Sequence, residues 1–239
     1  MPDAGAPSPL LKVAGLNAWY GESHVLHGVD FHIAPGEVVT LLGRNGAGKT
    51  TTLKAIMGMV GRRSGSVAYD GHETIGLPSN RIARLGLAFC PEERGIFASL
   101  DVEENLLLPP AVRPGGLAVD TIFELFPNLR ERLRSQGTKL SGGEQQMLAI
   151  ARILRTGARL LLLDEPTEGL APVIIEQIGR TIERLKAEGF TILLVEQNFR
   201  FAATVADRHY VVDRGKVIDM IPNAQLEANM GKLHEYLGV

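Results

Sequence analysis

The sequence predicts an α/β fold built on a mostly parallel sheet, and three observations support it. Apolar runs typical of buried strands alternate along the chain with segments whose apolar residues recur at helical spacing. Two of these runs, "EVVTLL" at 37–42 and "RLLLLD" at 159–164, lead directly into glycine-rich or acidic segments, as strands do where open parallel sheets bind ligands. Residues 93–155 change character and read as mostly helical, which indicates an inserted helical subdomain.

The first third of the chain predicts strands, one helix and a hairpin. Residues 1–9 are rich in proline and alanine and predict a flexible tail, and 10–42 predict short strands joined by turns in an N-terminal antiparallel subdomain. The segment "TLKAIMGMV" at 52–60 carries apolar residues at helical spacing to its end. The dipeptide Asp70-Gly71 is typical of a hairpin turn.

The middle of the chain predicts one strand followed by helices. The run "LGLAFC" at 85–90 predicts a strand that contains Cys90, which we expect to be an inert core thiol. Two helices are expected to begin after Asp101 and Asp120, because aspartate is a preferred N-cap residue. The segment "EQQMLAIARIL" at 144–154 places four apolar residues on one face of a further helix.

The C-terminal third restores the alternation of strand and helix. A helix is expected between Pro172 and Gly189, because proline favours the first helical turn and glycine the end. The run "LLVEQN" at 193–198 predicts a buried strand that ends in polar residues, with the next helix beginning at its last asparagine. Two strands around a turn at Arg214-Gly215 complete the prediction.

Composition limits the function classes. Of the 239 residues, 45% are hydrophobic and 22% are charged, which is an ordinary globular balance. The net charge of -2 excludes a bulk attraction to nucleic acid or anionic lipid. A single cysteine suits a reducing cytoplasm. No leader is visible, and no apolar run approaches the roughly 18 residues of a membrane helix, so another chain is expected to hold this one at any membrane.

The segment "GRNGAGKT" fits the phosphate-loop (Walker A) pattern G-x-x-x-x-G-K-[ST], with a predicted strand before it and a helix after it. Glycines let backbone N–H groups face an anion, and the helix adds its N-terminal partial positive charge. Lys49 is expected to reach the β- and γ-phosphates, and Thr50 to hold Mg²⁺. The predicted ATP-binding residues here are Gly43, Arg44, Asn45, Gly46, Ala47, Gly48, Lys49, Thr50 and Thr51.

Two further segments carry chemistry. In "LLLLDEP" a buried strand ends in Asp164, a predicted Mg²⁺ ligand, and Glu165, a candidate general base for the water that attacks the γ-phosphate. Alone, the pair would more simply be solvated acids at a strand end. In "LSGGEQQ", Ser141 and Glu144 have the spacing of a capping box, which leaves two consecutive glycines to explain. The glycines suit a close approach of backbone N–H groups to phosphate, and both interpretations are compatible.

In this order and spacing the three motifs resemble those of the nucleotide-binding subunit of an ABC transporter, over roughly residues 10–239 as one domain. The resemblance implies a P-loop NTPase core of the RecA-like kind and ATP hydrolysis. It also implies that two such domains pair head to tail around two ATP molecules. Ser141, Gly142 and Gly143 would then bind the ATP held by the partner domain.

Other family positions match or depart from the pattern. Tyr20 matches the aromatic residue that stacks on adenine, although an ordinary loop tyrosine is the alternative. Glu92 stands where the family offers glutamine to Mg²⁺ and water, so the resemblance implies a third Mg²⁺ residue beside Thr50 and Asp164. Ala171 stands where the family has aspartate. Gln197 occupies the switch position that is usually histidine, so the predicted catalytic set is Lys49, Glu165 and Gln197. An amide donates a hydrogen bond to phosphate but carries no proton charge; capping of the strand end or of the next helix is the structural alternative.

The segments "PEERGIF", "DEPTEGLAP", "LLVEQN" and "EYLGV" resemble the second, shorter ATPase subunit of branched-chain amino acid importers. The resemblance implies a second ATPase subunit or a homodimer, two transmembrane subunits, a periplasmic binding protein and no nucleic acid as partners. It places the chain peripherally at the cytoplasmic face of the inner membrane. Three alternatives stay open: a urea or short-chain amide importer, a soluble ABC ATPase acting on ribosomes or DNA, and a nucleotide-dependent clamp with little hydrolysis.

Overall fold

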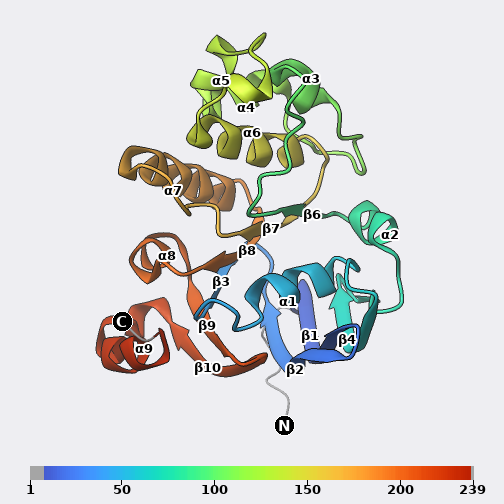
Figure 1. The fold of residues 1–239 in the computed structure, drawn as a ribbon, viewed down its shortest axis with the longest axis vertical. Helices are drawn as coiled ribbons and strands as arrows, with labels where there is room; N and C mark the ends of the chain where they lie inside the picture. The colour runs from blue at the N-terminus through green and yellow to red at the C-terminus, as the bar shows by residue number, and fades with distance from the viewer. Residues whose placement is uncertain (1–7, 238–239) are drawn as a thin grey trace.

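The computed structural model describes residues 8–237, which form two sheets and a group of helices (Figure 1). Residues 1–7 of the predicted tail lie outside the described residues. In Figure 1 the helices between β6 and β7 gather at the top, and the N-terminal antiparallel sheet lies at the lower right. None of the helices within residues 8–237 is long and apolar enough to cross a membrane.

The N-terminal sheet is antiparallel, as predicted, with strand order β2-β1-β4-β5. Its strands are β1 (Leu11–Tyr20), β2 (Ser23–Ile33), β4 (Arg62–Tyr69) and β5 (His72–Glu73). Asp70 and Gly71 both have positive φ, 48° and 75°, which is the conformation that a type I′ hairpin turn needs. The predicted hairpin is therefore confirmed.

The larger sheet has strand order β10-β9-β3-β8-β7-β6, and only β10 runs antiparallel to its neighbour. Its strands are β3 (Val38–Leu42), β6 (Leu87–Cys90), β7 (Leu160–Asp164), β8 (Thr191–Glu196), β9 (Arg208–Asp213) and β10 (Lys216–Pro222). Every residue of β3, β7 and β8 is buried, as their apolar runs predict. Because β3, β8 and β7 are adjacent and parallel, the polar segments that follow them meet at one edge of the sheet.

The helices of the described chain are α1 (Lys49–Ile56), α2 (Ser79–Arg84), α3 (Val102–Leu107), α4 (Val119–Leu125), α5 (Pro127–Glu131), α6 (Gly142–Leu154), α7 (Pro172–Ala187), α8 (Phe199–Val205) and α9 (Met230–Leu237). Short 3-10 turns stand at Gly137–Lys139, Asn223–Gln225 and Glu227–Asn229. Asp101 caps α3 in a capping box and Pro172 opens α7, which confirms both predictions.

Two helix predictions are wrong in detail. Asp120 is not an N-cap, because the cap position of α4 is Ala118 and Asp120 lies inside the first turn, where its carboxylate faces the positive end of the helix. The helix expected through residue 60 ends at Ile56, because Gly58 takes a left-handed φ of 71° that stops the helical path.

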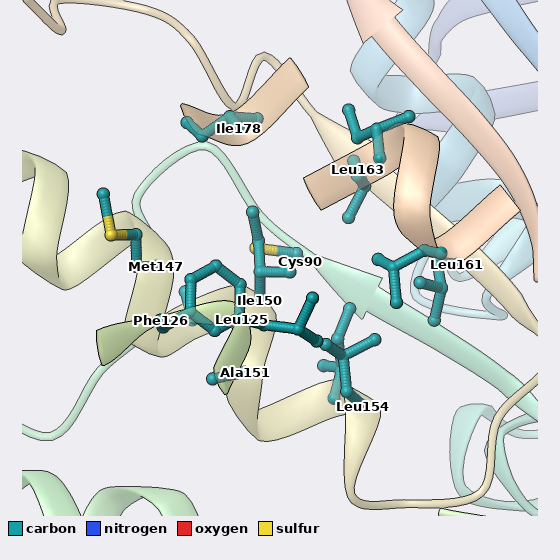
Figure 2. Close-up of a cluster of buried hydrophobic side chains, with 14 of the residues drawn as sticks. Cys90, Leu125, Phe126, Met147, Ile150, Ala151, Leu154, Leu161, Leu163 and Ile178 are labelled. Atoms are coloured by element: carbon teal, nitrogen blue, oxygen red, sulfur yellow. The ribbon is translucent and has the colours of Figure 1, made fainter. Parts of the chain in front are cut away.

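The helical segment packs on the sheet through α6. Its predicted apolar face, Met147, Ile150, Ala151 and Leu154, is buried against Leu161 and Leu163 of β7 (Figure 2). Cys90 lies within this cluster, and burial raises the pKa of its thiol to about 12. A thiol that stays protonated at neutral pH is a poor nucleophile, so the expectation of an inert core cysteine is confirmed.

Candidate functional site

A cavity of about 420 Å³ lies at the carboxyl edge of the large sheet. It collects residues from the phosphate loop, the acid pair and the segment after β8, which are far apart in the sequence. The lining residues are Val25, Asn45, Gly46, Gly48, Lys49, Thr50, Thr51, Glu92, Glu165, Glu168 and Gln197. The cavity is therefore the place where the predicted motifs meet.

The phosphate loop connects β3 to α1 and leaves the start of the helix open. Gly48, the N-cap residue of α1, has φ 105°, a conformation that strains any residue with a Cβ, and it provides no capping side chain. Lys49 is only 4% exposed, and its ammonium donates to the carbonyl oxygens of Gly43 at 2.9 Å and Arg44 at 3.1 Å. The loop thus presents a held cation and uncapped N–H groups, which suits an anionic ligand.

Asp164 lies at the end of β7, beneath Thr50. The Thr50 hydroxyl donates to Oδ1 of Asp164 at 3.0 Å, while Oδ2 is buried and has no hydrogen-bond partner among the described residues. Burial raises the pKa of Asp164 to about 6, with the negative charges of Glu165 and Glu92 adding to the shift. A buried carboxylate with a free oxygen beside a threonine hydroxyl fits a hard divalent cation such as Mg²⁺.

Glu165 is held in a strained backbone conformation, with φ 45° in the left-handed region. One carboxylate oxygen, Oε1, lies 3.3 Å from the ammonium of Lys49. The other, Oε2, accepts a hydrogen bond from Nε2 of Gln197. The backbone N–H of Glu165 also donates to the carbonyl of Val195 on β8 at 3.0 Å. Both the side chain and the backbone of Glu165 are therefore fixed by neighbouring elements.

Glu168 is a cavity residue that the sequence analysis missed. A hydrogen bond shared with Glu165 raises the pKa of the Glu168 carboxyl, and burial and the charges of Glu165 and Glu92 add to the shift. Glu168 lies three residues after Glu165, and its backbone N–H donates to the Glu165 carbonyl at 3.2 Å, as in a β-turn. Within residues 8–237, no group of three or more His, Cys, Asp or Glu side chains is arranged to hold a metal. Any cation bound here would complete its ligand set with phosphate or water.

Several predicted site residues lie outside this cavity. Gly43, Arg44 and Ala47 belong to the phosphate loop but are not among its lining residues. Tyr20, at the end of β1, is 49% exposed and also does not line the cavity. Ala171 is at the N-cap position of α7 and provides no side-chain cap.

Residues 141–143, which we call the signature turn, lie at the start of α6, apart from the cavity, and carry the predicted capping box. The backbone N–H of Glu144 donates to the Ser141 hydroxyl at 3.3 Å, and the Glu144 carboxylate accepts from the Ser141 N–H at 2.7 Å. Gly143 has a packing reason, because a Cβ there would lie 2.9 Å from Ile174 of α7. Around Gly142, by contrast, the nearest group is the flexible guanidinium of Arg94 at 3.3 Å.

The N-cap of α8 is Asn198 and not Gln197. Asn198 accepts from the backbone N–H of Phe201 at 3.1 Å and is the N-cap, so the side chain of Gln197 remains available to Glu165. The preceding residue, Glu196, is buried and accepts a hydrogen bond from the Thr167 hydroxyl at 2.7 Å. Neither Glu196 nor Thr167 was assigned a role from the sequence, although a buried strand that ends in an acidic residue was an available signal.

Comparison with known proteins gives one consistent result. The family model described as ABC transporter matches residues 26–168. The branched-chain amino acid transport ATP-binding protein BraG of Pseudomonas aeruginosa is 44% identical over 238 residues, covering 96% of this chain and 100% of BraG. The probable branched-chain amino acid transport ATP-binding protein LivF of Archaeoglobus fulgidus is 39% identical over 212 residues, covering 87% of this chain and 90% of LivF. Among solved structures, a nucleotide-free ATP-binding cassette from an ABC transporter shares the fold, with a TM-score of 0.84 at 22% identity, covering 97% of this chain and 99% of that one.

Proposed function

This chain belongs to the ABC transporter family of ATP-binding subunits, and from that premise we propose that it energises an importer of branched-chain amino acids. The chain is an ATPase subunit of an ABC importer; the cargo is the proposed part. The cargo assignment is supported by the 44% identity that spans the whole of BraG. The catalytic assignment is carried by one observation: Glu165 is held between Lys49 and Gln197 in the cavity that the phosphate loop lines.

In this proposal the phosphate loop binds the triphosphate of ATP. The uncapped N–H groups at the start of α1 and the ammonium of Lys49 face its negative charge. Thr50 and Asp164 would hold Mg²⁺, with Glu92 as a further candidate ligand, and the cation would neutralise charge on the phosphates. The buried, unpartnered oxygen of Asp164 supports this metal assignment.

Glu165 is proposed as the general base. It accepts a proton from the water that attacks the γ-phosphorus, while the bond from that phosphorus to the ADP oxygen breaks. Gln197 orients the carboxylate through its Nε2 donor and reaches toward the γ-phosphate from the end of β8. Since the ammonium of Lys49 is 3.3 Å from the same carboxylate, binding of phosphate by Lys49 would also release Glu165 toward the water.

The signature turn is proposed to serve a second cassette. Ser141, Gly142 and Gly143 lie outside the cavity and would contact the ATP of the partner domain in a head-to-tail dimer. Tyr20 would stack on adenine from the exposed end of β1. The partner cassette is a second ATPase subunit or a second copy of this chain.

The remaining partners are proposed to be two transmembrane subunits and, indirectly, a periplasmic binding protein, with this chain at the cytoplasmic face of the membrane. Residues 10–239 would act as one nucleotide-binding unit with a helical insertion at about 93–155. Phe97, 48% exposed in the loop after β6, is suited to contact a membrane subunit and pass on the motion of closure.

The proposal is tested by uptake in a strain that lacks this subunit. Complementation with the wild-type chain should restore uptake of radiolabelled leucine, and complementation with Glu165→Gln should not. Uptake of labelled urea and of a short-chain amide is measured in the same cells. Restoration of urea or amide uptake without leucine uptake would replace the cargo assignment and leave the ATPase assignment intact.

A further inference from the structure

The pair Thr167 and Glu196 lies directly behind the proposed catalytic residues and has no part in the function proposed above. The Thr167 hydroxyl donates to Oε1 of Glu196 at 2.7 Å, and the backbone N–H of Asn198 approaches Oε2 at 3.3 Å. Thr167 is 5% exposed and Glu196 is 2% exposed. Both carboxylate oxygens therefore have donors inside the protein.

Glu196 is an unusual residue to bury. Among the described residues no lysine, arginine or histidine forms an ion pair with it. Burial raises the pKa of its carboxyl to about 7, and the negative charge of Glu165 adds to the shift. A buried carboxyl group without a cation lowers the stability of the fold, and an apolar residue would pack there at lower cost. The benefit that offsets this loss of stability is expected to come from the segments that the carboxyl group joins.

Glu196 and Thr167 connect the two segments that carry the proposed base and its amide partner. Thr167 is two residues beyond Glu165, and Glu196 is the residue before Gln197. The Thr167–Glu196 hydrogen bond and the Glu165–Gln197 hydrogen bond consequently join the same two loops. A third link is the backbone hydrogen bond from Glu165 to Val195.

We propose that Thr167 and Glu196 form a clasp that holds the loop after β7 at the distance from β8 at which Gln197 reaches Glu165. Both are positioning residues: they act on hydrolysis through Gln197 and touch neither nucleotide nor water. The inference rests on the proposed roles of Glu165 and Gln197. It identifies residues that set the rate of the chemical step without contributing to ATP affinity.

The geometry accounts for this separation of rate from affinity. The ATP-binding groups stand on the loop between β3 and α1, which neither Thr167 nor Glu196 contacts by a hydrogen bond. The clasp instead sets the position of the Gln197 side chain relative to Glu165, by holding the loop after β7 against the end of β8. A misplacement of about 1 Å in a catalytic group is enough to slow the chemical step on the order of a hundredfold.

The test compares Thr167→Val with Thr167→Ser in the full chain. Valine keeps the shape of threonine and removes the hydroxyl, whereas serine keeps the hydroxyl. ATP affinity is measured with a fluorescent analogue, and cleavage is followed in single turnovers with the chain in excess over radiolabelled ATP. We expect Thr167→Val to cleave on the order of tenfold more slowly with unchanged affinity, and Thr167→Ser to cleave within about twofold of wild type.

The decisive measurement repeats both variants in the Gln197→Ala background. If the clasp acts through Gln197, Thr167→Val has no further effect on cleavage once the amide is gone. An equal tenfold loss in that background would overturn the clasp, as would a parallel loss of affinity and rate. Glu196→Gln retains an acceptor for the Thr167 hydroxyl, so it is a second bond-retaining control and should cleave ATP within about twofold of wild type.

The clasp and the proposed role of Gln197 can be refuted separately. A Gln197→Ala chain that cleaves ATP at the wild-type rate overturns the proposed role of Gln197, and the clasp with it. A slow Gln197→Ala chain with an additive Thr167→Val effect overturns the clasp alone. Thermal melting of each variant shows whether slow cleavage is accompanied by loss of the folded state.

Discussion

Gln197 donates from its Nε2 to one carboxylate oxygen of Glu165, while the ammonium of Lys49 lies 3.3 Å from the other. The three residues come from the end of β8, the end of β7 and the first turn of α1. Since the hydrogen bond of the amide and the charge of the lysine act on different oxygens, each can be removed by mutation without removing the other.

Replacing Lys49 by alanine should weaken ATP binding. The change removes the buried cation of the phosphate loop, worth roughly 1.5–3 kcal/mol as a hydrogen bond to a charged group, or about ten- to a hundredfold in affinity. Lys54 on the same helix does not line the cavity, so Lys54→Ala is the matched control and should bind nearly as wild type. Titration with a fluorescent ATP analogue checks both; equal affinities would refute the phosphate-loop assignment.

Replacing Glu165 by glutamine should stop hydrolysis and preserve binding. The amide keeps the size of the carboxylate but no longer accepts the proton of water, while the phosphate loop is unchanged. An ATP-bound dimer should then accumulate on size exclusion. Glu168→Gln changes a second carboxylate of the same cavity, one that contacts Glu165 but neither Lys49 nor Gln197. An amide can still donate a hydrogen bond to the Glu165 carboxylate, so this variant should retain most of the turnover. If Glu168→Gln is the inactive variant, the base has been misassigned.

Two substitutions at Ser141 separate the capping of α6 by the signature turn from its proposed contact with the partner's ATP. Both Ser141→Ala and Ser141→Arg remove the hydroxyl that caps α6, and each should lower the free energy of unfolding by about 1 kcal/mol. Only arginine adds bulk where the partner's ATP is proposed to bind. ATP-driven dimerisation, measured in the Glu165→Gln background, should persist with alanine and fail with arginine.

A dimer lost equally in both Ser141 variants would mean that the turn acts through the fold of α6. The ATP affinity of the isolated monomer is a second measurement. It should stay near wild type in both variants, because the turn lies outside this chain's own cavity.

Glu196 makes the stability of the chain depend on pH in a predictable direction. Its pKa is raised from an ordinary 4.5 to about 7 by burial, so the folded chain binds more protons than the unfolded chain between those values. The contribution to stability is thus present below pH 4.5 and is lost as the pH rises to about 7. Residue 196 does not titrate in the Glu196→Gln variant. Between pH 5 and pH 8 the free energy of unfolding of this variant should therefore rise relative to that of wild type, by on the order of 2–3 kcal/mol.

Melting of the two chains at a series of pH values gives this difference directly. His209 shifts in the opposite sense, because burial lowers its pKa, and its contribution is present above its ordinary pKa and is lost as the pH falls. That contribution is common to both chains and cancels in the comparison. A difference that is constant with pH would show that Glu196 titrates alike in the folded and unfolded states.

The sequence predicted the convergence of the motifs but not the contacts between their side chains. Apolar runs at β3, β7 and β8 were enough to place the polar segments after them at one edge of a parallel sheet. The bond between Glu165 and Gln197 joins residues 32 positions apart and depends on the register of β7 against β8. No local pattern encodes that register, since both strands are buried throughout and apolar except at their ends.

Short elements escaped prediction for a different reason. Helix α2 has six residues, less than two turns, so it shows little apolar periodicity. Helix α9 has eight residues, and its apolar periodicity was overlooked in the sequence. Asp120 has the residue type of an N-cap, but the chain reaches helical geometry two residues earlier, because apolar packing of α4 overrides the preference of one side chain. The motifs that meet at the cavity consist of glycine, lysine and acidic residues at the ends of strands, so their placement does not depend on helix boundaries.

The last prediction concerns Gln197 itself. Gln197→Ala removes the donor to Glu165 and should slow hydrolysis without changing ATP affinity. The expected loss is that of one hydrogen bond to a charged group, roughly 1.5–3 kcal/mol, or on the order of ten- to a hundredfold in rate. Gln197→His should match or exceed wild type, because an imidazole N–H donates to the same carboxylate and its ring can also carry charge.

Gln197→Glu is the matched control for size. It keeps the length of the side chain but places a second carboxylate against Glu165, so it should be at least as slow as alanine. Phosphate release at saturating Mg-ATP orders the four chains, with folding checked by melting. The order expected is histidine at or above glutamine, then alanine, then glutamate. If alanine turns over like wild type, the hydrogen bond to Glu165 has no catalytic role, and the amide at the end of β8 serves only to join two loops.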